Sequence, residues 1–303
     1  QKIPMVFEVR DLWPEIPIAM GVLKSPVTRF LAHKLEKFAY DNSAAVVALS
    51  PGMRDGVIKS GYQFEKVAVI PNSADVDLFQ VNVKLGQEFR KLRGWLGGKP
   101  LLVYTGTFGL INGVSYMVDI ATHLLKTAPS IRILLVGNGI EYEQVLAMAK
   151  KNGVLNVNLF IENKIPKKDI PAALSAASMT SSLVIDKVEM QSNSANKFFD
   201  SLAAGKPIMI NYGGWQKELL EKSGAGIATN DLPSKEAAQK IADAIQDQVW
   251  LKKASEASLK MAEELFSRDV LVVQLEQVMQ LVLKGREIEV SKIAPGDYKR
   301  LFE

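Results

Sequence analysis

Short apolar runs alternate with amphipathic stretches along most of the chain, and this alternation most restricts the folds open to it. The spacing predicts strands followed by helices, with short connections between them. Such a succession is typical of a parallel sheet, because a crossover helix must bring each strand back to the same edge. The expected strands are Pro4–Arg10, Ala44–Leu49, Lys66–Ile70, Leu101–Thr105, Ile131–Val136, Val157–Ile161, Ser181–Ile185, Pro207–Asn211 and Gly226–Thr229.

The length of 303 residues suits roughly two α/β domains. We expect the boundary between the domains after Phe79 and before Pro100, in the stretch 81–99, which is polar and interrupted by glycines. The predicted division is a first domain over 1–92 and a second over 93–268. The remaining residues, 269–303, are expected to form a last helix, Val270–Leu283, and a polar tail.

Composition excludes several classes of protein. The chain has no Cys and only two His, which argues against disulfides, a thiol nucleophile, a His-rich metal site and a Ser-His-Asp triad. No run approaches the roughly 20 apolar residues of a membrane-spanning helix. With 37 basic and 33 acidic residues, the net charge of +4 is mild; it permits a nucleotide or an anionic membrane as partner and demands neither. We expect a cytoplasmic protein that binds no nucleic acid.

The apolar and basic stretch 17–40 has two interpretations. Pro26 divides it, and its second half carries apolar residues on one side with Arg, His and Lys around them. A helix packed on the sheet is the interpretation we favour. The alternative is a surface that rests on anionic lipid at the inner face of a membrane.

The stretch Ser192–Pro207 predicts a polar loop and a short helix that ends at Gly205 in the left-handed conformation. Asn193 or Ser194 is the expected N-cap. The core-facing residues are expected to be Phe198, Phe199, Leu202 and Ala203. The start of the helix, with Asn196, Lys197 and Asp200 nearby, could bind an anion, although an ordinary capped helix would have the same sequence.

Glycines and polar residues follow several of the predicted strands. The first strand ends in Arg10 and Asp11, and later strands run into Gly106-Thr107-Phe108-Gly109 and Gly137-Asn138-Gly139. In an open parallel sheet, ligands gather at these carboxyl ends. Neither glycine motif is a complete dinucleotide or Walker sequence. Their convergence with a bare helix start nevertheless indicates a nucleotide diphosphate site.

The chain resembles the retaining glycosyltransferases of the family-4 type, which have the GT-B fold. It is most similar to bacterial O-antigen and capsule enzymes that transfer N-acetylfucosamine-like amino sugars. The motifs that carry the resemblance, in chain order, are Val9–Glu15, Ala48–Met53, Val69–Asp75, Tyr104–Gly109, Leu135–Gly139 and Asn196–Pro207.

The resemblance implies an α/β GT-B architecture of two Rossmann-like, doubly wound parallel-sheet domains. The family places roughly a hundred further residues of the first domain ahead of the position of Ile3. We therefore expect a truncated first domain, completed by a missing N-terminal segment or by a partner chain, since an open sheet edge must pair with something.

The resemblance also implies the roles of the site residues. The family usually has two carboxylates eight positions apart here: Asp200 falls on the second, which binds the ribose, whereas the first position is Ser192, which is not acidic, so the usual hexose contact there is in doubt. Thr107 and Asn112 stand where a basic pair usually holds the diphosphate, which leaves more of that charge to Lys197. The expected catalytic residues are Arg10, Asp11 and Lys197. The expected nucleotide-sugar ligands are Gly106, Thr107, Gly109, Gly137, Asn138, Gly139, Lys164, Ser192, Asn196 and Asp200.

The function that the resemblance implies is retaining transfer from a nucleotide diphosphate sugar, expected to be a UDP-linked amino sugar. The acceptor would be a lipid-linked glycan in the synthesis of lipopolysaccharide, O-antigen or capsule. No cofactor or metal is expected. Two alternatives stay open: a nucleotide-sugar 2-epimerase of the same fold, and a non-catalytic donor-binding subunit that needs a partner.

Overall fold

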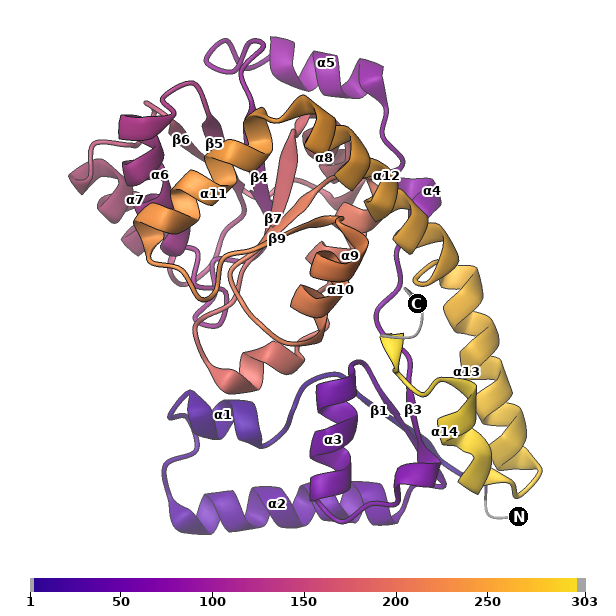
Figure 1. The fold of residues 1–303 in the computed structure, drawn as a ribbon. Helices are drawn as coiled ribbons and strands as arrows, with labels where there is room; N and C mark the ends of the chain where they lie inside the picture. The colour runs from indigo at the N-terminus through magenta and orange to yellow at the C-terminus, as the bar shows by residue number, and fades with distance from the viewer. Residues whose placement is uncertain (1–2, 299–303) are drawn as a thin grey trace.

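The computed structural model describes residues 3–298, which form two parallel sheets covered by helices (Figure 1). The strands are β1 (Val6–Val9), β2 (Ala45–Ala48), β3 (Val67–Val69), β4 (Leu101–Thr105), β5 (Arg132–Val136), β6 (Leu159–Glu162), β7 (Met179–Ser182), β8 (Ile208–Ile210) and β9 (Gly226–Ala228). The α-helices are α1 (Glu15–Ala19), α2 (Pro26–Asp41), α3 (Pro51–Lys59), α4 (Val76–Phe79), α5 (Val83–Lys91), α6 (Tyr116–Thr127), α7 (Tyr142–Lys151), α8 (Ile170–Ala176), α9 (Asn196–Ala203), α10 (Trp215–Ser223), α11 (Ser234–Gln246), α12 (Gln248–Glu264), α13 (Arg268–Leu283) and α14 (Val290–Ile293). Short 3-10 helices are η1 (Phe64–Lys66), η2 (Lys167–Asp169), η3 (Val188–Ser192) and η4 (Glu287–Glu289).

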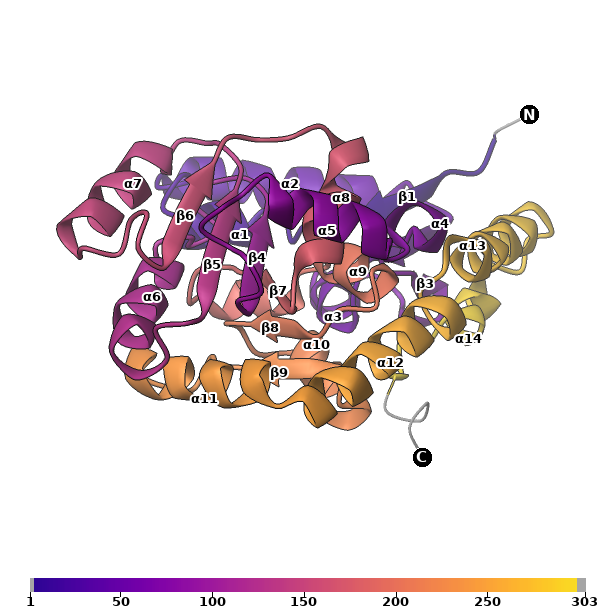
Figure 2. The same ribbon diagram turned by 90° about the horizontal axis from the view of Figure 1, so that it is seen from above.

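The larger sheet has the strand order β6-β5-β4-β7-β8-β9, with every pair parallel. Figure 2 shows the strands side by side in this order. Side chains alternate between two cores: Leu101 and Val103 pack with α8, α9, α10 and α12, whereas Leu102 and Tyr104 pack with α6, α7 and α11. Strands β5 and β6 extend the sheet on one side of β4, and β7, β8 and β9 extend it on the other, so the strand order reverses between β4 and β7. Open α/β sheets bind ligands at such a point.

The smaller sheet has the order β1-β2-β3 and is also parallel. Residues of α3 and the end of α2, such as Met53 and Tyr40, cover one face. The other face packs against α13 and α14, through residues such as Val278 and Val290. The last long helix therefore returns to the first sheet after α12 leaves the second (Figure 1). Both sheets and the GT-B architecture agree with the fold expected from the sequence.

Two crossings between the sheets run side by side. The backbone N–H of Ala74 donates to the carbonyl of Phe266 at 2.7 Å, and Ala74 forms an isolated parallel bridge with Ser267. Next to this bridge, the guanidinium of Arg268 meets the carboxylate of Asp75 at 2.5 Å. The crossing that leaves the first sheet at Ala74 and the crossing that returns to it at Ser267 are thus bonded to each other at one point.

The structure shows two features of the connections that the sequence did not predict. The stretch 81–99 contains α5, which packs closely on α8, because its buried residues Gly86 and Phe89 face the second domain's helices. The tail after α13 is also structured: Val290 and Ala294 enter the core of the first sheet, and the backbone N–H of Val69 donates to Ala294 at 2.7 Å. The division at residue 92 stays a prediction, and the packing of α5 favours a division ahead of that helix.

Candidate functional site

The loop before α9 is held by the first domain. The hydroxyl of Ser50 donates to the carbonyl of Ser192 at 2.5 Å, across 142 residues of sequence. The side-chain amide of Asn72 donates to the carbonyl of Ser194, and its backbone N–H donates to the Ser194 hydroxyl at 3.4 Å. The first domain therefore positions the loop that leads into α9.

Helix α9 begins without a side-chain cap, so the expected cap at Asn193 or Ser194 is wrong. The N-cap residue is Ala195, because the Asn193 side chain bonds within its own loop and Ser194 is engaged by Asn72. The first N–H groups of the helix thus receive no side-chain acceptor and carry the positive end of the helix dipole. At the other end, Gly205 has the expected left-handed conformation, with φ of +52°.

Lys197 joins the start of α9 to the end of β4. Its ammonium lies 5.5 Å from the centre of the Tyr104 ring. Its methylene stem packs over Gly106, where an added Cβ would lie 3.0 Å from Lys197 Cδ. Burial lowers the pKa of Lys197, while the carboxylate of Asp200 opposes that effect. The structure therefore brings together two residues that the sequence placed in one site from widely separated motifs.

A cavity of about 170 Å³ opens at the carboxyl ends of β4 and β5. It is lined by Thr105, Gly106, Thr107, Val136, Gly137, Asn138, Lys164, Ile165 and Ile170. The absence of a side chain at Gly137 lets the two loops touch, since a Cβ there would lie 1.8 Å from the Gly106 carbonyl oxygen. Gly109 and Gly139 are not among the lining residues; Gly139 lies against the backbone of Phe108, and Gly109 lies beside the Asn112 side chain.

A second cavity, of about 300 Å³, lies between the domains. The first domain contributes Arg10, Asp11, Leu12, Ile16, Leu49, Met53 and Asn72. The second domain contributes Ile111, Asn112, Leu183, Val184, Glu189, Met190, Ser192, Asn193, Ser194, Ala195, Asn196 and Lys197. Five of the residues predicted for the site therefore meet here: Arg10, Asp11, Ser192, Asn196 and Lys197.

The charges of this cleft come from both domains. Desolvation raises the pKa of Asp11, and the neighbouring Arg10 guanidinium partly offsets that effect. Arg10 also pairs loosely with Glu8, at 3.6 Å. Glu189 and Asn72 line the cleft as well, and sequence reasoning missed both. Neither stands in a glycine motif, and only the fold brings their loops to the cleft.

Asp200 lies one turn of α9 beyond Lys197 and is not among the residues that line either cavity. Burial raises its pKa from the ordinary value of 3.8 to about 6. Lys167 opposes this effect, Asp75 adds to it, and Lys197 opposes it less strongly. The carboxylate is thus held in a desolvated cluster of charges beside the site.

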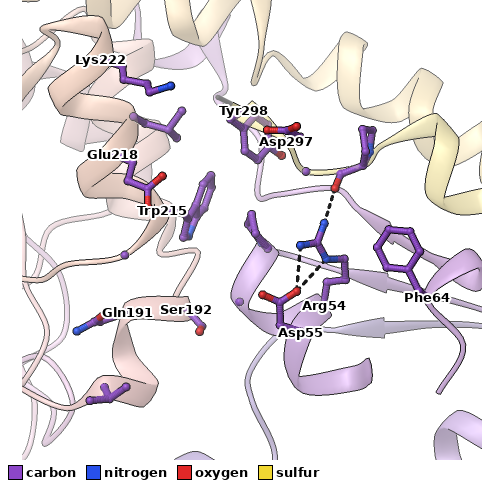
Figure 3. A pocket seen from close by; sticks show the side chains of 17 residues that line it. Arg54, Asp55, Phe64, Gln191, Ser192, Trp215, Glu218, Lys222, Asp297 and Tyr298 are labelled. Carbon is purple, nitrogen blue, oxygen red and sulfur yellow. Dashed lines mark hydrogen bonds and ion pairs between the residues drawn. The ribbon is translucent and has the colours of Figure 1, made fainter. Parts of the chain in front are cut away.

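A third cavity, of about 800 Å³, lies between α3, α10 and the last described residues (Figure 3). Arg54 forms one wall; it pairs with Asp55 at 3.0 Å and donates to the carbonyl of Pro295 at 2.6 Å. On the opposite side, the rings of Trp215 and Tyr298 lie 5.4 Å apart. Of the predicted site residues, Ser192 alone lines this cavity, so the predicted site and this cavity are different places.

The arrangement around α9 suits a diphosphate. Three features lie at the strand ends where the strand order of the sheet reverses: the uncapped start of α9, the ammonium of Lys197, and the cavity that Lys164 lines. Fixed N–H groups and a desolvated cation attract anions more strongly than they would in bulk water.

Within residues 3–298, no helix is both long and apolar enough to cross a membrane.

Sequence comparisons find two matching families. Residues 1–73 match the family described as "Glycosyl transferase 4-like domain", and residues 87–263 match "Glycosyl transferases group 1". Among curated proteins, the chain is 22% identical over 103 residues to "Putative glycosyltransferase EpsF" of Bacillus subtilis (strain 168). That stretch covers 34% of this chain and 27% of the relative.

Solved structures of similar fold cover most of the chain. Anabaena Alr3699/HepE, in complex with UDP and glucose, superposes with a TM-score of 0.74 at 19% identity, covering 91% of this chain and 71% of that one. WaaG, a glycosyltransferase involved in lipopolysaccharide biosynthesis, gives a TM-score of 0.69 at 15% identity, covering 93% and 76%. A glycosyltransferase from Rickettsia africae ESF-5 gives 0.69 at 15% identity, covering 92% and 77%. Since the second family matches more than half of the sequence, the chain belongs to the glycosyl transferases group 1.

Proposed function

We propose that the chain is a retaining glycosyltransferase that uses a nucleotide diphosphate sugar, with UDP as the nucleotide and an amino sugar as the group transferred. The observation that carries the proposal is the meeting of Lys197 and the uncapped start of α9 with the glycine loops of β4 and β5. The family supports it, as do the UDP complex of Alr3699/HepE and the fold shared with that protein.

In this proposal, the nucleotide lies at the ends of β4 and β5 and the sugar extends into the cleft between the domains. Gly106, Thr107, Gly137, Asn138 and Lys164 would line the nucleotide's path. Asp200 would bind the ribose from its place on α9. Gly109 and Gly139 would act by shaping the loops, because each lies against neighbouring backbone or side-chain atoms.

The chemical task is to stabilise the diphosphate as the glycosidic bond to the sugar breaks. Negative charge then grows on the phosphate oxygens. The N–H groups of Asn196 and its neighbours, together with the ammonium of Lys197, would stabilise it without reorganising. Arg10 and Asp11 would face the sugar from the first domain, since both line the same cleft as Lys197.

The acceptor in this proposal is a lipid-linked glycan at the inner face of a membrane, used in cell-surface polysaccharide synthesis. Helix α2 supports a membrane contact. Its Ala32 and Tyr40 are buried on the protein side, whereas Val27, Phe30, Leu31, Leu35 and Phe38 are 57–66% exposed. Arg29, Lys34 and Lys37 are exposed on the same helix, a combination that suits an anionic bilayer.

A second candidate is a donor-binding subunit that acts with another polypeptide. The edge position of β1 favours it, because among the described strands β1 pairs with β2 alone. Beside that edge, Phe7, Trp13 and Leu35 help to line an open cavity of about 350 Å³. An unpaired parallel edge with apolar surroundings is a surface that further chain normally covers.

The test incubates the purified chain with labelled UDP-sugars and a lipid-linked glycan acceptor, and measures the labelled product and its anomeric configuration. A product that keeps the donor's configuration supports the retaining transferase. Binding of UDP without any product supports the donor-binding subunit. Isomerised free donor would instead identify an epimerase, and failure to bind any nucleotide would overturn all three.

A further inference from the structure

We propose that Glu189 determines which sugar the site accepts, by binding hydroxyl groups of the transferred sugar across the cleft from Asp11. The inference rests on the proposed function, since it assigns the group that recognises the donor's sugar. It concerns a residue in η3 that none of the sequence motifs contains.

The first observation is that Glu189 is a half-buried carboxylate facing a cavity without a partner. It lines the 300 Å³ cleft, and within residues 3–298 it takes part in no hydrogen bond or ion pair. An ionised carboxylate only accepts hydrogen bonds and has several acceptor positions to fill. A ligand rich in hydroxyl groups would supply donors to these positions.

The second observation is that the cations lining the cleft are directed elsewhere. Arg10 pairs with Glu8 at 3.6 Å and lies beside Asp11, and the Lys197 ammonium lies over the Tyr104 ring. Neither is therefore the counter-ion of Glu189. The Glu189 carboxylate is left for a neutral donor such as a sugar hydroxyl.

The third observation is that Ser192, the other candidate sugar ligand in this loop, is already engaged in the contact between the domains. Ser192 is packed into the domain contact, where a Cβ on Gly52 would lie 2.2 Å from its hydroxyl oxygen. Its carbonyl already accepts from Ser50. Glu189, three residues earlier, is the acidic side chain that this loop contributes to the cleft. A volume of 300 Å³ is at the small end of ligand pockets and suits one sugar residue.

The experiment compares calorimetric affinities for UDP and for two UDP-sugars, UDP-glucose and UDP-N-acetylglucosamine, in the full chain. The variants are Glu189→Ala and Glu189→Gln, and the matched control is Asp186→Asn, an exposed acid three residues earlier that does not line the cleft. We expect Glu189→Ala to bind the preferred UDP-sugar about tenfold or more weakly, as expected for one hydrogen bond to a charged group. Its affinity for UDP should stay within about twofold, because UDP lacks the transferred sugar that would occupy the cleft.

The difference between UDP and UDP-sugar separates recognition from a structural role, since a misfolded loop would weaken both ligands. Glu189→Gln should lie between wild type and Glu189→Ala, and Asp186→Asn should match wild type. An equal loss for UDP and UDP-sugar, or no loss for either, overturns the inference while leaving the proposed function in place. Absence of nucleotide binding by the wild-type chain would overturn the proposed function itself.

Discussion

Asp200 gives the sharpest quantitative prediction, through the substitution Asp200→Asn. In the folded chain its pKa is raised from 3.8 to about 6, mainly by burial. The folded state therefore favours the protonated form more than the unfolded state does. Each pKa unit is worth about 1.4 kcal/mol, so at pH 8 the ionised carboxylate costs the folded state about 3 kcal/mol. An amide of the same shape removes that cost.

Because folding raises the pKa of Asp200, its effect on the free energy of unfolding depends on pH in a definite direction. Well below pH 3.8 the carboxyl is protonated in both states and costs nothing, and the cost grows between pH 3.8, where the unfolded group ionises, and about 6, where the folded group ionises. The assay is urea unfolding of wild type and Asp200→Asn at several pH values between about 4 and 8. We expect the variant to be more stable by about 3 kcal/mol at pH 8 and nearly equal to wild type at pH 4.

The same substitution should weaken UDP binding, because the proposed ribose contact loses its charge. A variant that is both more stable and a poorer binder would show that the desolvated carboxylate is kept for function. A stability difference that does not change with pH, or a variant less stable than wild type at pH 8, would refute the burial argument.

Three further predictions concern the same region. Lys197→Met should weaken UDP binding about tenfold to a hundredfold in calorimetry, whereas substitution of an exposed lysine, Lys187→Met, should not weaken it. Because burial lowers the pKa of Lys197, the affinity of wild type for UDP should also decline with rising pH at a lower pH than an ordinary lysine would titrate. Gly137→Ala places a Cβ 1.8 Å from a facing carbonyl oxygen and should cost at least about 1–3 kcal/mol in urea unfolding, whereas Gly94→Ala, with open space around it, should be nearly neutral. Burial lowers the pKa of Lys206 to about 8, although its ammonium donates to two carbonyls at the end of α8, at 3.2 and 2.8 Å; in the same assay, the stability of wild type relative to Lys206→Met should therefore rise as pH increases from about 8 to 10.

Much of the fold could be predicted because its elements are set by local patterns. Strands such as Leu101–Thr105 are unbroken apolar runs, and Phe198, Phe199 and Leu202 are fully buried, as their helical spacing predicts. The glycines after β4 and β5 indicated loops that approach closely, and Gly137 and Gly106 do touch. Such features follow from a few adjacent residues.

Features that depend on distant contacts could not be predicted. The cap expected at Asn193 or Ser194 is wrong because the Asn193 side chain bonds within its own loop and Asn72, 122 residues from Ser194, engages Ser194. Glu189 belongs to no motif, and only the fold places it in the cleft. The tail carries no strong apolar period, yet the ring of Tyr298 packs against that of Trp215, tilted by 31°, once α13 has returned to the first sheet.

Hydrogen–deuterium exchange with and without UDP tests the central claim most directly, because it reports both whether a nucleotide binds and where. The account predicts slower exchange in residues 104–109 and 136–139 and at the start of α9, with little change around the large cavity between α3 and α10. Unchanged exchange at α9 and at the ends of β4 and β5, with UDP at saturating concentration, would contradict it.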